Sequence, residues 1–145
     1  MKKMAFGLTA VALASTLAFM QAPSTAHAGA GSWDFKWSGV AAVGDVYTNF
    51  DYPVHVINSG GGDFKVKVTG NTMPNDTLYV ALYETDDGGN TGRLIDSKPL
   101  YGGTGDVIFS GLSNYVDGTN NYAEIVVKMK KSGSGVASVS AEFYD

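Results

Sequence analysis

Apolar and polar residues alternate along most of the chain from Trp33 onward, with the period of two that is typical of β-strands. The clearest case is the segment 64–68, Phe-Lys-Val-Lys-Val, whose apolar side chains share one face and whose lysines share the other. The same alternation over residues 123–129 and 137–143 predicts two more half-buried strands. This part of the chain carries no apolar stripe of the kind that marks an amphipathic helix.

Two further segments carry aromatic residues at alternate positions. Residues 33–37 read Trp-Asp-Phe-Lys-Trp, which predicts three aromatic side chains on one face of a strand. Residues 78–83 read Leu-Tyr-Val-Ala-Leu-Tyr, which is apolar on both faces and predicts a central strand. Weaker patterns predict strands at residues 43–50, 53–57, 93–98 and 107–109. We expect four phenylalanines in the core, namely Phe35, Phe64, Phe109 and Phe143.

The segments between the predicted strands are rich in glycine, asparagine and aspartate. Such segments occupy residues 58–63, 86–90, 102–106 and 117–121, and their residue types tolerate the positive φ angles that tight turns require. Seven to nine short strands joined by turns of this kind predict an all-β fold, a single antiparallel β-sandwich.

One stretch carries a resemblance to a known structural feature. Phe109-Ser110-Gly111-Leu112, then Asp117-Gly118, then Tyr122 ahead of an apolar strand is similar to the tyrosine corner of Greek-key sandwiches. In that feature a tyrosine at the start of a strand bonds to backbone upstream. The resemblance covers about 20 residues and implies an immunoglobulin-like arrangement, although the cysteines and the mid-chain tryptophan of immunoglobulin domains are missing.

The first 28 residues have the features of a secretory signal peptide. Lys2 and Lys3 precede an apolar run from Met4 to Met20, and Ala26-His27-Ala28 is a small-residue cleavage site. An uncleaved membrane anchor is the alternative, but the run is short for a span of about 20 residues. We therefore predict a signal peptide over residues 1–28, a secreted domain over residues 29–145, and no stable membrane anchor.

Charge and cysteine content exclude several classes of function. The net charge is −4, and it becomes −6 once Lys2 and Lys3 are removed; an acidic domain is a poor nucleic-acid binder because phosphate contacts dominate that affinity. The chain has no cysteine, which excludes disulfides, thiolate metal sites and cysteine catalysis. The glycine-rich motifs of nucleotide-binding loops are also absent.

Catalytic chemistry has few candidates. His55 is the one histidine after residue 28, and it is either a general base or a strand residue that points to solvent. Glu84 and Glu124 adjoin apolar strands and are the acids of most interest for a glycosidase-like carboxylate pair. The predicted loops are too short to form a deep cleft, so we expect no enzymatic activity, with a hydrolase as an alternative.

The acidic turn at residues 86–90 suggests one candidate metal. Asp86, Asp87 and Asn90 are oxygen ligands of the type that calcium takes, and Asp117, Asn120 and Asn121 would complete a site if both loops lie at the same end of the fold. The same residues also suit an ordinary hairpin turn. We expect no cofactor, with calcium as the one candidate ion.

Aromatic side chains are the best functional candidates. Tyr79 and Tyr83 flank Ala81 on one face of a strand, which predicts a shallow gap between two rings, and Trp33 and Trp37 flank Phe35 in the same way. Sugar rings, peptides and partner proteins stack on such surfaces; the alternative is packing between sheets. We therefore predict extracellular recognition of a polysaccharide or a protein by a monomer or weakly self-associating protein.

Two other functions stay open. A secreted effector, either an enzyme inhibitor or an antibacterial toxin, would present the loop 71–75, in which Pro74 stiffens the segment beside Met73. A structural matrix protein would polymerise by strand exchange through the aromatic segment 33–37.

Overall fold

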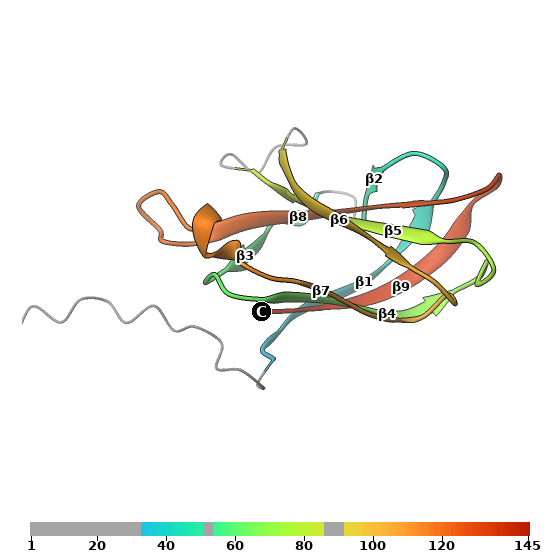
Figure 1. The fold of residues 1–145 in the computed structure, drawn as a ribbon, viewed down its shortest axis with the longest axis horizontal. Helices are drawn as coiled ribbons and strands as arrows, with labels where there is room; N and C mark the ends of the chain where they lie inside the picture. The colour runs from blue at the N-terminus through green and yellow to red at the C-terminus, as the bar shows by residue number, and fades with distance from the viewer. Residues whose placement is uncertain (1–32, 51–53, 86–91) are drawn as a thin grey trace, which may run out of the picture.

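The computed structural model describes residues 33–50, 54–85 and 92–145, which form two antiparallel β-sheets (Figure 1). Sheet A has the strand order β1-β9-β4-β7, with bounds Phe35–Val43, Ala137–Tyr144, Phe64–Asn71 and Gly105–Phe109. Sheet B has the order β2-β8-β5-β6, with bounds Thr48–Asn49, Ala123–Lys131, Leu78–Glu84 and Arg93–Leu100. Strand β3, Ile57–Ser59, also pairs with β8.

The predicted all-β class is confirmed. In β4, Phe64, Val66 and Val68 are buried while the lysines between them face outward. Strand β5 lies between β6 and β8, as its apolar faces predicted. The described part of the chain contains one short 3₁₀ helix, η1 (Leu112–Tyr115), and no helix in it is long and apolar enough to cross a membrane.

A single hydrophobic cluster draws residues from both sheets. It includes Phe64, Phe109 and Phe143 as predicted, and Leu78, Val80 and Leu82 of β5 are fully buried. Burial of such side chains contributes about 2 kcal/mol each. The cluster therefore depends on the inward faces that the alternating pattern predicted.

The prediction for Phe35 is wrong, because β1 contains a β-bulge. Phe35 pairs with Tyr144 and Trp37 pairs with Phe143, so two steps along β1 oppose one step along β9. An extra residue in one strand shifts the phase of the side chains that precede it. As a result Phe35 is 58% exposed, and its ring packs edge-on against Tyr144 with 5.7 Å between centroids.

The resemblance to a tyrosine corner does not extend to its defining bond. Tyr122 directly precedes β8 as expected, but its side chain is 44% exposed. Its backbone N–H donates to Asn120 Oδ1 at 3.1 Å, and the residue forms an isolated bridge with Asp117. Within the described ranges the Tyr122 hydroxyl has no backbone partner, so this residue does not pin a crossover.

Candidate functional site

The outer face of β5 carries two of the predicted binding residues. Tyr79 and Tyr83 lie on this face, half-buried, while the residues that alternate with them point into the core. The flanking strands β6 and β8 hold β5 on both sides. The two rings therefore lie on a strand that is hydrogen-bonded to a neighbour on each side.

Two lysines of β8 lie over these rings. Lys130 pairs with Tyr79 across the strands, and its Nζ atom is 5.2 Å from the Tyr79 ring centroid. The Nζ atom of Lys128 is 4.4 Å from the centroid of Tyr83. An ammonium group over an aromatic ring is attracted by the electron-rich face of that ring. The lysines therefore place positive charge where the sequence suggested bare stacking surfaces.

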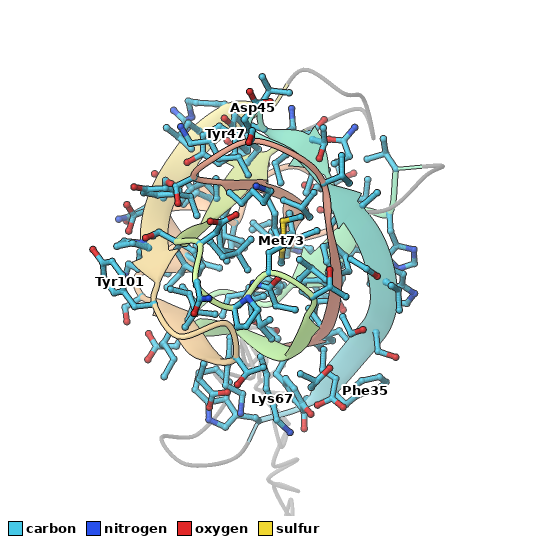
Figure 2. The ribbon with its side chains drawn as sticks, turned by 90° about the vertical axis from the view of Figure 1, so that its right-hand side faces the viewer. Phe35, Asp45, Tyr47, Lys67, Met73 and Tyr101 are labelled. Atoms are coloured by element: carbon cyan, nitrogen blue, oxygen red, sulfur yellow. The ribbon has the colours of Figure 1, made fainter. Side chains whose placement is uncertain are left out.

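A third tyrosine, which the sequence analysis missed, belongs to the same face. Tyr47 precedes β2, and its hydroxyl forms a 2.5 Å hydrogen bond with Ser97 Oγ of β6. The bond connects the segment before β2 with β6, the strand at the opposite end of the order β2-β8-β5-β6. Lys130 Nζ lies 4.7 Å from its ring centroid. Figure 2 shows Tyr47 at one rim of the molecule, beside Asp45.

The predicted gap at Ala81 is absent. Ala81 pairs with Ser97, the residue that binds the Tyr47 hydroxyl, and it is fully buried. The surface is therefore continuous, and we call it the tyrosine–lysine face. It consists of Tyr47, Tyr79, Tyr83, Lys128 and Lys130. Within the part of the chain that the structure describes, Lys130 makes no ion pair with a carboxylate.

The outer face of sheet A carries a second lysine–aromatic cluster. Lys65 Nζ lies 4.7 Å from the Trp33 ring centroid and 4.4 Å from that of Tyr144. The Tyr144 hydroxyl donates to Glu142 Oε2 at 2.6 Å, and Lys67 Nζ lies 3.2 Å from the same oxygen. This cluster therefore contains a carboxylate of its own, that of Glu142.

These contacts change three acid–base equilibria. The hydrogen bond from Tyr144, followed by that from Lys67, lowers the pKa of Glu142 below its ordinary value. The same hydrogen bonds to Glu142 raise the pKa of Tyr144 and the pKa of Lys67. The charge of Lys67 is therefore matched by a carboxylate that stays ionised to lower pH.

The prediction that Trp33 and Trp37 share a face is wrong. The bulge in β1 turns Trp37 toward the core, where it stacks on Phe143 and on His55, with ring centroids 5.2 and 4.7 Å apart. A Cβ atom at Gly39 would lie 2.3 Å from indole Cη2, so the ring lies directly on this glycine. Trp37 closes one edge of the core and is not a free stacking surface.

The surroundings of Trp37 hold no ligand-sized cavity. A cavity of about 10 Å³ lies beside Trp37, Phe50 and His55, which is room for about one water molecule. His55 is exposed to solvent apart from its contact with Trp37. This agrees with the interpretation of His55 as a solvent-facing residue.

Glu84 is occupied by an ion pair. It is 7% exposed, and its Oε2 atom accepts a 3.0 Å hydrogen bond from Arg93. The Arg93 guanidinium in turn lies 5.0 Å from the ring centroid of Tyr115. The Glu84 carboxylate is therefore engaged by Arg93 at the end of β5.

The predicted calcium ligands Asp86, Asp87 and Asn90 lie outside the described residues. Of the second loop, Asp117 and Asn120 border an open surface hollow of about 400 Å³ together with Glu124, and Glu124 accepts a hydrogen bond from Asn120. Among the residues that the structure describes, no group of three or more histidine, aspartate or glutamate side chains is placed to hold a metal ion.

The loop 71–75 is anchored rather than presented. Met73 packs partly buried against the core cluster, and Figure 2 shows it in the middle of this end of the molecule. The Thr72 N–H donates to Ser138 O at 3.1 Å, and the Ser138 N–H donates to Thr72 Oγ1 at 2.9 Å. Thr72, Pro74 and Asn75 are exposed beside it, so the inhibitor function of this loop stays a prediction.

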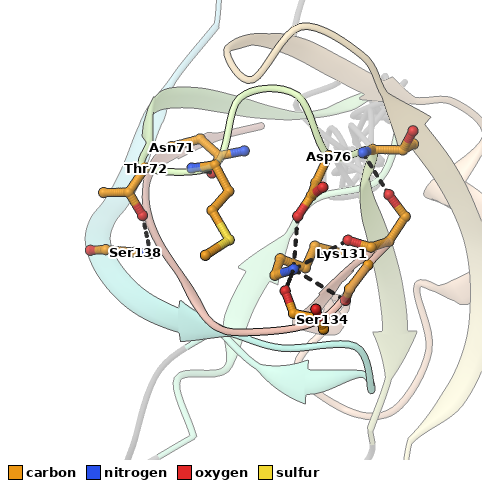
Figure 3. A network of polar contacts seen from close by, with 10 residues as sticks. Asn71, Thr72, Asp76, Lys131, Ser134 and Ser138 are labelled. Atoms are coloured by element: carbon orange, nitrogen blue, oxygen red, sulfur yellow. Dashed lines mark hydrogen bonds and ion pairs between the residues drawn. The ribbon is translucent and has the colours of Figure 1, made fainter.

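A buried lysine fixes the neighbouring turn, as Figure 3 shows. The Lys131 side chain is 1% exposed and its Nζ atom lies 2.8 Å from Asp76 Oδ2. It also donates to the carbonyls of Ser132, Gly133 and Ser134, at 3.2, 3.1 and 2.7 Å. Lys131 continues the buried phase of Ala123, Ile125, Val127 and Met129, which is the signal by which the sequence could have revealed it.

Comparisons with known proteins identify relatives of the chain. The family model described as "YndA coiled coil domain" matches residues 42–143. The protein YndA of Bacillus subtilis (strain 168), described as uncharacterized, is 34% identical over 126 residues, which is 86% of this chain and 83% of that protein. The described part of the matched segment forms strands and one 3₁₀ helix, whereas a coiled coil is built from α-helices. The chain belongs to the YndA coiled coil domain family.

Proposed function

We propose that the protein is a small, secreted, non-enzymatic β-sandwich of immunoglobulin-like type that binds acidic polysaccharide of the cell surface or extracellular matrix. The proposed signal peptide at residues 1–28 delivers residues 29–145 to the outside of the cell. The observation that carries the proposal is the tyrosine–lysine face, on which ammonium groups lie over the rings of Tyr47, Tyr79 and Tyr83.

The position of the lysines favours an acidic ligand over a neutral one. Lys128 and Lys130 already cover part of the tyrosine rings, so a neutral sugar would have to displace them before it could stack. A carboxylate or phosphate group on a polymer would instead add an ion pair to the cation–π contacts of Lys130. The rings then position the ammonium groups and contact the apolar faces of the sugars.

The overall charge of the protein strengthens the case for a localised site. The chain is acidic as a whole, so a polyanion is repelled by the molecule except where positive charge is concentrated. On sheet A the charge of Lys67 is matched by Glu142. Lys130 on sheet B makes no ion pair with a carboxylate among the described residues, and its contacts with the rings of Tyr47 and Tyr79 support the tyrosine–lysine face as a site for an anion.

The experiment compares two matched double variants by isothermal titration calorimetry. Lys128→Gln/Lys130→Gln removes two charges from the tyrosine–lysine face, and Lys65→Gln/Lys67→Gln removes two from sheet A. The probes are polygalacturonate for carboxylate, poly(glycerol phosphate) for phosphate, and neutral dextran. We expect the first variant to weaken binding of an acidic probe about tenfold, which corresponds to about 1.4 kcal/mol, and the second to weaken it less than about twofold.

Two controls make the result decisive. Thermal unfolding of each variant establishes that the fold is retained, and higher salt is expected to weaken binding because ions screen surface charges. Equal loss in both double variants, or binding of dextran as tight as that of the acidic probes, would refute the proposed site.

A further inference from the structure

The open edges of the two sheets differ in how they are protected. An exposed strand edge presents unpaired N–H and C=O groups, and proteins usually blunt it with charge, proline, short length or a covering group. Strands β2 and β3 span two and three residues, so the edge of sheet B that they form is short and interrupted. The opposite edge of sheet B, β6, contains Pro99, Lys98 and Arg93.

The β7 edge of sheet A is also covered. Lys98 Nζ donates to the backbone carbonyl of Ile108 at 2.7 Å, and the same ammonium lies 5.2 Å from the ring centroid of Phe109. A carbonyl of the edge is thus occupied by a positively charged side chain. β7 is therefore protected by the device that edge strands commonly use.

Strand β1 is the remaining edge strand. Apart from the bulge near its start, it has none of the protective features that the other edges have. The segment Trp37–Val43 contains no charged residue and no proline, and its register with β9 is regular from Trp37 to Val43. Val40 lies in the middle of this segment and is 64% exposed. Among the residues that the structure describes, β1 is thus a long, uncharged edge with an apolar side chain at its centre.

We propose that the β1 edge pairs with the β1 edge of a second copy of this chain, in antiparallel orientation, so that two copies of sheet A join into one continuous sheet. The inference is independent of the proposed function, because β1 and the tyrosine–lysine face belong to different sheets. Its partner is a second copy because the uncharged segment Trp37–Val43 can pair with its own copy without opposing like charges.

Pairing the whole uncharged segment with its own copy places Val40 on the twofold axis. Val40 then lies opposite Val40 of the second copy, and Ser38 lies opposite Ala42 on the same outer face. On the other face Trp37 lies opposite Val43, and Gly39 lies opposite Ala41. This register opposes no like charges, because Lys36 is outside the paired segment.

The edge is narrow, so the dimer forms weakly and reversibly. An interface of this kind is smaller than the roughly 1,200–2,000 Å² that stable complexes bury. Its strength comes from backbone hydrogen bonds and from removing Val40 from water. We therefore expect the dimer to form only where the protein is concentrated.

Sedimentation velocity over about a hundredfold range of concentration tests the proposal. The full chain is expressed in an exporting host and the form that accumulates is purified. We expect its sedimentation coefficient to rise with concentration, and we expect Val40→Lys to stay at the monomer value because two ammonium groups would face each other. Val46→Lys is the matched control, since Val46 is also 64% exposed but lies outside β1.

A cysteine cross-link tests the register. The chain has no cysteine, so Val40→Cys introduces a single thiol, and residues opposite each other in an antiparallel pair lie within disulfide distance. We expect Val40→Cys to form a covalent dimer on mild oxidation at least about tenfold faster than Val46→Cys. A monomer at every concentration, equal association of the two lysine variants, or equal cross-linking of the two cysteine variants would overturn the proposal.

Discussion

Strands β1 and β5 begin from the same sequence signature and end in different structures. In each case two aromatic residues lie four positions apart: Tyr79 and Tyr83 within β5, and Trp37 of β1 with Trp33 just before it. In β5 both rings remain on the outer face. At β1 a bulge separates the pair, so that Trp37 packs on the core while Trp33 contacts Lys65 on the outside.

The difference follows from where each strand lies. β5 has a paired neighbour on both sides, so an extra residue would break two ladders and turn core residues outward. β1 pairs with β9 alone, and an edge strand can accommodate a bulge at the cost of one ladder. The other register shifts lie where β4 is paired with β9 alone and in the β5–β6 ladder, where the extra residue belongs to the edge strand β6. Alternating patterns are therefore most reliable at positions that are paired on both sides.

Single-residue deletions give the largest expected contrast. Deleting Lys36 from β1 removes the extra residue and leaves a regular ladder, so we expect a change in unfolding free energy of no more than about 1 kcal/mol. Deleting Ala81 from β5 reverses the faces of the residues on one side of the deletion, and we expect no folded protein. Circular dichroism and urea unfolding measure both. Folding of the Ala81 deletion with native stability would contradict the role assigned to β5.

Truncating the two aromatic groups gives the next largest contrast. We expect Trp37→Ala to destabilise the protein by about 3 kcal/mol, because the indole closes the core beside Phe143 and Phe50. Tyr79→Ala should cost about 1 kcal/mol, since its ring is half-buried on an outer face. Urea unfolding compares them, with Phe35→Ala as an exposed control. Equal losses for Trp37→Ala and Phe35→Ala would contradict the bulge.

Two substitutions at Tyr47 measure separately what packing and hydrogen bonding contribute to the stability of sheet B. Tyr47→Ala should cost about 2 kcal/mol because it removes both the ring that Lys130 contacts and the bond to Ser97, whereas Tyr47→Phe should cost about 1 kcal/mol through loss of the bond to Ser97 alone. A double-mutant cycle with Ser97→Ala measures that bond alone. Additive effects of Tyr47→Phe and Ser97→Ala would show that the two groups do not interact.

Sequence reasoning succeeded where local pattern decides the structure. The period of two placed β4, β5, β8 and β9 and the burial of Phe64 and Phe143, because side-chain direction in a paired strand depends on position alone. It failed for Phe35, since the same alternation is compatible with a bulge. A pattern identifies faces only as long as the ladder is regular.

The candidate site was predictable only in part for a related reason. The positions of Tyr79 and Tyr83 follow from β5 itself, but the Tyr47–Ser97 bond joins residues 50 positions apart. The packing of Met73 against Gly135 likewise depends on two turns that meet only in the folded protein. Contacts between turns or across several strands do not produce a periodic pattern in the sequence, so they cannot be predicted from it.

The smallest predicted effect concerns the carboxylate of sheet A. The pKa of Glu142 is lower in the folded than in the unfolded chain, so its contribution to stability is present above the unfolded value and is lost as pH falls through the folded value. A ¹³C NMR titration of the Glu142 carboxyl should give a higher midpoint in Tyr144→Phe than in Lys67→Gln, because the Tyr144 bond is the larger cause. An unchanged midpoint in Tyr144→Phe would contradict this assignment.

The most direct test of the account is to map the ligand-induced chemical-shift changes in ¹⁵N-labelled protein during titration with polygalacturonate. The account predicts that saturable changes concentrate at Tyr47, Tyr79, Tyr83, Lys128 and Lys130, on the outer face of sheet B. Signals of Trp33, Lys65 and Lys67 on sheet A should stay within about a fifth of the largest change. Saturable changes centred on sheet A, with the tyrosine–lysine face unaffected, would contradict the assignment of the binding site.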